Sequence, residues 1–99
     1  MSRVERTRRA SLDLQQIWLY IAERNYPAAD RLIDRMEKAL TLLNQNPFAG
    51  QTVEHLRPNT RQFTVGNYAL LFEPTSRGIR LLRVAHSSRR LEDLLLSDE

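Results

Sequence analysis

Two helical stripes joined by a very short break constrain this chain more than any other feature. The second stripe runs from residue 28 to about 45, with apolar residues at Ala29, Leu32, Ile33, Met36, Leu40 and Leu43. An earlier stripe over residues 11 to 24 has the same spacing, at Leu12, Leu14, Ile17, Trp18 and Ile21. Because only two or three residues separate them, the two helices must be antiparallel neighbours. Such a hairpin needs a surface to cover its apolar stripes.

The ends of the two helices carry recognisable signals. Ser11 is a plausible N-cap for the first helix, and Asp13 lies in its first turn, where an acid suits the helix dipole. Asn25-Tyr26-Pro27 interrupts the pattern, and Pro27 fits the first position of the second helix because its missing N–H would have had no partner there.

The second half of the chain has the alternation and turns of a sheet. Phe63 and Val65 alternate with polar neighbours, and Gly66-Asn67 suits a type II′ hairpin turn. Residues 68–72 form a nearly continuous apolar run, which predicts a central strand, and residues 79–85 predict the last strand.

The segments outside this pattern give weaker signals. Residues 3–8 are expected to form an edge strand, and residues 47–59 a loop anchored by Phe48 and Leu56. At 99 residues, the chain is expected to be a single domain over residues 1–99. The predicted fold is α+β: an N-terminal strand, an antiparallel helical hairpin packed on a three- to four-stranded antiparallel sheet, and a short C-terminal helix or tail.

The end of the chain conflicts with the dipole rule. Ser87 or Ser88 could cap a last helix through Leu96, which would place Arg89 and Arg90 in its first turn. Asp98 and Glu99 would then follow its end, so both charge signs would oppose the dipole. Either the two arginines are placed to contact an anion, or the segment is a frayed tail.

Several classes of protein are disfavoured by composition. The chain has no cysteine, which fits a reducing cytosol, and no run approaches the roughly 20 apolar residues of a membrane span. The first residues, MSRVERTRR, lack the apolar core of a signal peptide. His55 and His86 are the only histidines and have no acid at ligand spacing, so we expect no metal and no cofactor.

Positive charge is concentrated in the predicted sheet. Residues 55–91 contain seven arginines and one acid, Glu73. A guanidinium suits phosphates and carboxylates, so this segment favours an acidic partner, although a GC-rich genome would give the same bias.

A metal-independent nuclease is a second possibility. Arg57, Arg61 and Arg83 could stabilise a pentacovalent phosphate, and His86 could move protons. This requires strand pairing that brings His86 near Arg61. A histidine at a strand end can equally well make only local hydrogen bonds.

Several short sequence motifs in this chain, taken together and in this order, resemble the ParE/RelE toxin superfamily over nearly the whole chain. They are Asp13-Leu14-x-x-Ile17-Trp18-x-Tyr20-Ile21-Ala22, Ala28-Ala29-Asp30-x-Leu32, Asn46-Pro47-x-x-Gly50, Leu56-Arg57, Arg61-x-Phe63, Gly66-Asn67-Tyr68 and Arg83-Val84-x-His86-x-x-Arg89. The resemblance implies the toxin of a type II toxin–antitoxin pair and supports the strand at residues 3–8.

The resemblance is stronger to the ParE branch. Trp18 and the ending His86-x-x-Arg89 are ParE-like, the sheet region has no lysine, and no tyrosine follows Arg90. One departure is Arg89-Arg90, where an Arg-Asp pair is usual. This branch implies a cytoplasmic inhibitor of DNA gyrase that is not an enzyme, causes growth arrest and stabilises plasmids. RelE-type mRNA cleavage on the ribosome, with Arg61, Arg83 and His86 as the catalytic set, is the alternative, and a non-toxic member that only binds its antitoxin is a third.

The resemblance also implies the partners. They are a cognate ParD-like antitoxin, in a hetero-oligomer, and DNA gyrase, with no membrane involved. The residues expected to contact target or antitoxin are Arg57, Arg61, Arg83, His86, Arg89 and Arg90.

Overall fold

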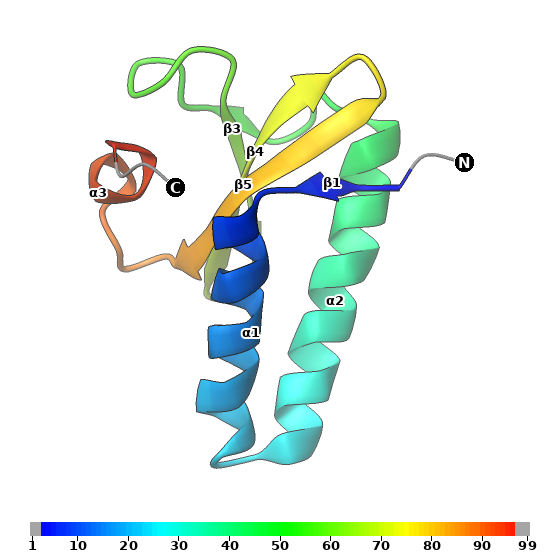
Figure 1. The fold of residues 1–99 in the computed structure, drawn as a ribbon, viewed down its shortest axis with the longest axis vertical. Helices are drawn as coiled ribbons and strands as arrows, with labels where there is room; N and C mark the ends of the chain where they lie inside the picture. Colours follow the sequence, from blue (N-terminus) through cyan, green and yellow to red (C-terminus); the bar gives the residue numbers. More distant parts are fainter. Residues whose placement is uncertain (1–2, 97–99) are drawn as a thin grey trace.

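The chain has the predicted α+β fold. The computed structural model describes residues 3–96, so Asp98 and Glu99 lie outside the described residues. Its elements, in chain order, are β1 (Glu5–Arg6), α1 (Arg8–Ala22), α2 (Tyr26–Gln45), β2 (Gln51–Thr52), β3 (Arg61–Val65), β4 (Tyr68–Thr75), β5 (Gly78–His86) and α3 (Leu91–Leu96). Figure 1 shows α1 and α2 side by side and antiparallel, projecting beyond one end of the sheet. No helix within the described residues is long and apolar enough to cross a membrane.

The sheet has five strands in the order β1-β5-β4-β3-β2, one more than the upper limit predicted. The extra strand β2, Gln51–Thr52, lies in the predicted loop and is fully polar and exposed, so it gives no apolar signal. Strand β1 pairs with β5 in parallel, which corrects the expectation of an antiparallel sheet. The partner of β1 is more than 70 residues away in sequence (Glu5↔Arg80), so its direction is set by tertiary packing and not by a hairpin.

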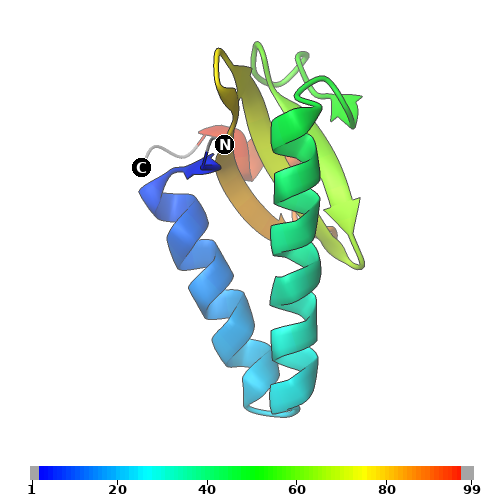
Figure 2. The same ribbon diagram turned by 90° about the vertical axis from the view of Figure 1, so that its right-hand side faces the viewer.

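Both faces of the sheet are covered. Leu70 and Phe72 of β4 pack with the helical hairpin, whereas Leu71 between them packs with Leu94 of α3 on the opposite face. The view in Figure 2 shows the hairpin on one side of the sheet and α3 on the other. Burial on both faces explains why residues 68–72 form an apolar run and do not alternate with polar residues.

The helices begin earlier than predicted. Thr7, and not Ser11, caps α1, because its hydroxyl accepts a 3.0 Å hydrogen bond from the Ala10 N–H. Asn25 caps α2 in the same way through Ala28, with Pro27 in the first turn as expected. The earlier start places Arg8 and Arg9 in the first turn of α1, which holds no acid. Each cation there opposes the helix dipole by about 0.3–1 kcal/mol.

The loop before β3 is anchored differently from the prediction. Phe48 is 72% exposed, and Leu56 is only half-buried. Val53 and Thr60 are buried instead, and the Val53 N–H donates to the Thr60 carbonyl at 2.9 Å. These two small β-branched residues therefore anchor the loop, and the Phe48 ring stays at the surface.

Helix α1 seals the outer edge of β5. Strand β1 pairs only with Arg80 and Leu81, so the edge beyond them would be open. The Thr7 N–H donates to the Leu81 carbonyl (2.9 Å), and the Thr7 hydroxyl to the Leu82 carbonyl (2.8 Å). Further along α1, Asp13 Oδ2 accepts the Val84 N–H at 2.9 Å. The backbone groups at the edge of β5 thus find their hydrogen-bond partners in a helix cap and a carboxylate.

Replacing Asp13 tests the importance of this seal. Asp13 also binds Arg83 through Nε (2.8 Å) and Nη2 (3.3 Å), and both side chains are nearly buried. Asp13→Asn leaves a buried guanidinium without its counter-charge, so we expect a loss of about 3–5 kcal/mol in the free energy of unfolding. Urea unfolding measures it.

Asp34→Asn is the matched control, because Asp34 forms an exposed i,i+4 pair with Lys38 at 3.2 Å. It should cost less than about 0.5 kcal/mol. Equal, small losses for both variants would show that the Asp13 contacts contribute no more to the free energy of unfolding than an exposed ion pair does.

Candidate functional site

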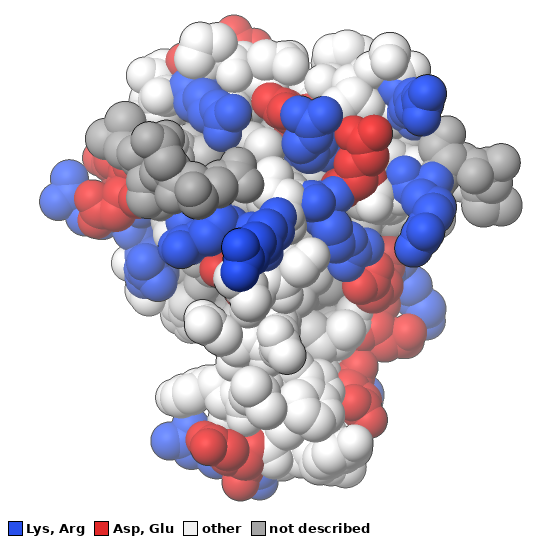
Figure 3. Space-filling model, viewed as in Figure 1, with Lys and Arg blue, Asp and Glu red and all other residues white. Residues whose placement is uncertain are grey.

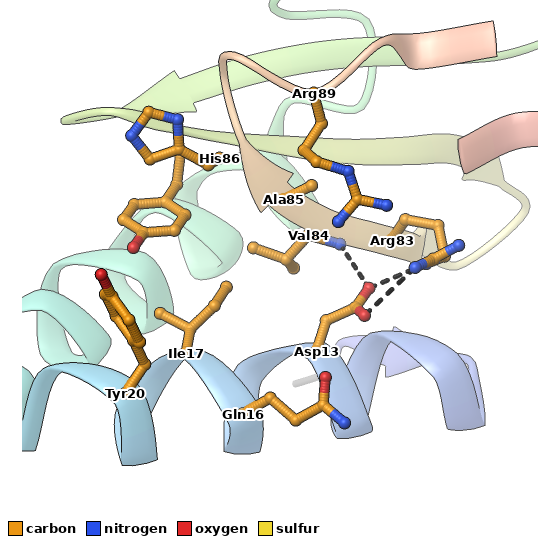
Figure 4. Close-up of a pocket in the computed structure, with 10 residues that line it drawn as sticks. Asp13, Gln16, Ile17, Tyr20, Arg83, Val84, Ala85, His86 and Arg89 are labelled. Atoms are coloured by element: carbon orange, nitrogen blue, oxygen red, sulfur yellow. Dashed lines mark hydrogen bonds and ion pairs between the residues drawn. The ribbon is translucent and has the colours of Figure 1, made fainter. Parts of the chain in front are cut away.

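A hollow of about 360 Å³ lies between α1 and the C-terminal end of β5. Figure 4 shows the side chains that line it. They are Asp13, Gln16, Ile17, Tyr20, Tyr68, Arg83, Val84, Ala85, His86 and Arg89. Four of the six residues predicted to bind a partner are at or beside this hollow, because Arg90 directly follows Arg89.

Arg83 forms part of the hollow's wall and is held from two sides. Asp13 of α1 binds it through both carboxylate oxygens, and its Nη1 donates to the Leu94 carbonyl of α3 at 3.4 Å. The residue is only 8% exposed. Arg83 therefore joins α1, β5 and α3.

His86 stands at the exposed end of β5 with a fixed ring. Its Nδ1 accepts the Ser88 N–H at 3.1 Å and lies 2.9 Å from the Ser88 hydroxyl, and its ring meets Tyr68 edge-on at 5.3 Å. Because a backbone N–H can only donate, the neutral ring must carry its proton on Nε2. The local hydrogen bonding foreseen for this histidine is thus present.

The connection after His86 differs from the prediction. Helix α3 starts at Leu91, so Arg89 and Arg90 precede it, and Glu92 and Asp93 occupy its first turn. The predicted conflict between the two arginines and the dipole of this helix is therefore wrong. Ser88 is engaged by His86, which removes it as an early cap.

Acids and arginines balance each other at the start of α3. The pKa of Glu92 is lowered, first by a hydrogen bond from its own backbone N–H and then by the Arg90 guanidinium. Arg90 Nη2 lies 3.6 Å from the Glu92 carboxylate. Both side chains remain accessible, so this pair leaves Arg90 at the surface.

Arg57 and Arg61 lie at the opposite end of the sheet. Arg61 donates to the carbonyls of Phe48 (2.7 Å), Ala49 (3.0 Å) and Gly50 (3.4 Å), and so holds the loop before β2. Arg57 makes a long contact of 4.0 Å with Glu73, and its side chain is 42% exposed.

Strand register separates the two groups of predicted residues. Arg61 is opposite Phe72 on β4, whereas His86 is opposite Tyr68, four residues away on the same strand. That offset is about 13 Å along the sheet, and β4 between them adds about 10 Å across it. The structure does not bring Arg61 and His86 together.

Several residues of the hollow cannot be assigned to it from the sequence. Gln16 and Tyr20 share one face of α1 with Asp13, a spacing that was visible in the sequence but could not be assigned to a face without knowing the neighbour of α1. Tyr68 was assigned only to a strand. Within residues 3–96, no group of three metal-ligating side chains comes together.

Known proteins are similar to this chain in sequence and in fold. Residues 4–91 match the family model of the ParE toxin of the type II toxin–antitoxin system parDE. Toxin ParE3 of Caulobacter vibrioides is 31% identical over 85 residues, which cover 85% of each chain. A chain of the chromosomal ParDE TA system from P. aeruginosa superposes with a TM-score of 0.71 at 23% identity, over 87% of this chain and 96% of that one, and so shares its fold. The chain belongs to the ParE toxin family of type II toxin–antitoxin systems.

Proposed function

We propose that this ParE-type toxin inhibits DNA gyrase by binding it, is neutralised by a ParD-like antitoxin, and acts in the cytoplasm to arrest growth. Membership of the ParE family supports the toxin role. The contact surface for gyrase is the exposed segment His86, Arg89 and Arg90 at the end of β5, beside the hollow along α1.

One observation carries the choice of binding over cleavage: Arg61 and His86 lie on opposite sides of β4, where they pair with residues four positions apart, Phe72 and Tyr68. A metal-independent nuclease needs cations and a proton-transfer group within hydrogen-bonding reach of one phosphate. Arg61 is bound to loop carbonyls, and Arg83 is bound to Asp13. We therefore assign Arg83 a positioning role beneath the surface that His86 and Arg89 present.

The antitoxin is proposed to cover the helical hairpin. A hollow of about 320 Å³, lined almost entirely by apolar atoms, runs between α1 and α2 along Leu14, Gln15, Trp18, Leu19 and Ile33. Leu19 is 52% exposed there. An amphipathic antitoxin segment would fold on binding this hollow, and its acids would pair with Arg57, whose side chain is 42% exposed.

A supercoiling assay tests the target. With purified gyrase and plasmid DNA, the toxin should block supercoiling and trap cleaved-DNA complexes. Unaffected gyrase, together with mRNA cuts that need ribosomes, would overturn the proposal in favour of an endonuclease.

Arg89→Ala/Arg90→Ala should weaken gyrase inhibition by more than tenfold, because two exposed cations leave the contact surface. Truncating the chain after Ala85 is a poorer test, since it removes Leu94, which is only 2% exposed and part of the core. Arg24→Ala/Arg31→Ala removes the same charge at the far end of the hairpin and should inhibit like the unmodified toxin. Equal inhibition by both variants would exclude the His86–Arg90 segment as the contact.

The antitoxin surface is tested by Leu19→Ser. Loss of this side chain should weaken binding of the cognate antitoxin about tenfold, which corresponds to roughly 1.4 kcal/mol of apolar contact. Leu42→Ser is the control, because Leu42 on α2 is 54% exposed but does not line the hollow. Titration calorimetry measures both; identical affinities would place the antitoxin elsewhere.

A further inference from the structure

Three arginines outside the proposed nuclease set are called the α1 strip: Arg8 and Arg9 in the first turn of α1, and Arg89 at the first hollow. Arg9 lies one turn before Asp13 on the same face of α1. Arg89 lines the hollow together with Asp13, and Figure 4 shows its guanidinium directed towards the Asp13–Arg83 pair. The strip therefore connects the start of α1 with the segment after β5.

Within residues 3–96 the α1 strip forms no ion pair, whereas several other arginines do. Among the ion pairs within residues 3–96, Glu37, Glu73 and Glu92 pair with Arg6, Arg80 and Arg90, and none involves the α1 strip. The charge of Asp13 is balanced by Arg83. Arg8 and Arg89 are exposed and Arg9 is partly exposed. Figure 3 shows basic side chains in a band across the middle of this face, above the largely uncharged surface of the hairpin.

Stability of the fold does not explain these arginines. Arg8 and Arg9 stand in the first turn of α1 without any acid, where their charge opposes the helix dipole. Neither contributes to the core. Their charge therefore stays available to a partner outside the chain.

We propose that the α1 strip binds the phosphate backbone of duplex DNA. The planar guanidinium fork matches two phosphate oxygens, and contacts of this kind need no base sequence. The choice of DNA over an acidic protein segment relies on the proposed function, because gyrase holds duplex DNA and Arg89 belongs to both surfaces. The toxin would then contact both the enzyme and the DNA that it cleaves.

Binding of the purified toxin to a short fluorescein-labelled duplex, without gyrase, tests this proposal. Anisotropy titrations from about 50 to 200 mM salt give the slope of log K against log salt. For Arg8→Gln/Arg9→Gln we expect the slope to shrink by about two, one for each lost phosphate contact. The melting temperature of this variant should stay the same or rise, because two unfavourable cations leave the start of α1.

Arg24→Gln/Arg31→Gln is the matched control, since it lowers the net charge equally and should keep the slope. An equal loss for both variants would mean that net charge alone attracts DNA, and an unchanged slope for Arg8→Gln/Arg9→Gln would remove the α1 strip from DNA binding. If the toxin bound polyglutamate through Arg8 and Arg9 but not the duplex, an acidic protein segment would replace DNA as the partner. None of these outcomes decides gyrase inhibition, which the supercoiling assay measures separately.

Discussion

The carboxylate of Asp13 is the contact on which the arrangement of this toxin depends. It accepts hydrogen bonds from Arg83 Nε (2.8 Å), Arg83 Nη2 (3.3 Å) and the Val84 N–H (2.9 Å). Removing two charges from water costs several kcal/mol, so a nearly buried pair of this kind is a weak source of net stability. Its effect is geometric: it fixes the rotation and height of α1 against β5, and through the bond from Arg83 to the Leu94 carbonyl it also fixes α3. Packing of apolar side chains alone would leave such a helix freer to slide.

The position of the proposed gyrase-binding surface follows from that contact. Once Asp13 faces β5, Gln16 and Tyr20 must face it too, because they lie on the same side of the helix. The hollow then opens where β5 ends, and His86 and Arg89 stand at its rim. A structural ion pair therefore lies directly beneath the surface proposed to meet gyrase, so that Arg83, at a family motif position, positions this surface and does not itself need to touch a target.

Local pattern was sufficient for the helices and the central strands, and insufficient wherever pairing over long distances decides the outcome. The periodicity of residues 28–45 predicted α2, and Gly66 takes the positive φ of 59° that its hairpin turn requires. The parallel pairing of β1, the polar strand β2 and the register shift between Leu71 and Phe72 leave no periodic signal. The same limit applies to the site, because the distance between Arg61 and His86 is a property of register. The choice of N-cap also depends on a contact outside the helix. The Thr7 hydroxyl caps α1 and in addition donates to the Leu82 carbonyl at the edge of β5, which Ser11 cannot do.

The charges of this toxin are distinguished by their placement more than by their number. The formal net charge is only +3, yet acids are placed beside particular arginines and not beside others. The ion pairs of Arg6 with Glu37 and of Arg80 with Glu73 offset positive charge on the side of the sheet near β1. Among the described residues, the charges of Arg8, Arg9 and Arg89 are not offset by an ion pair. Charges of one sign that gather on one face attract an anionic partner over a Debye length and orient the encounter. A modest overall charge can therefore still produce directed association where unpaired cations gather on one face.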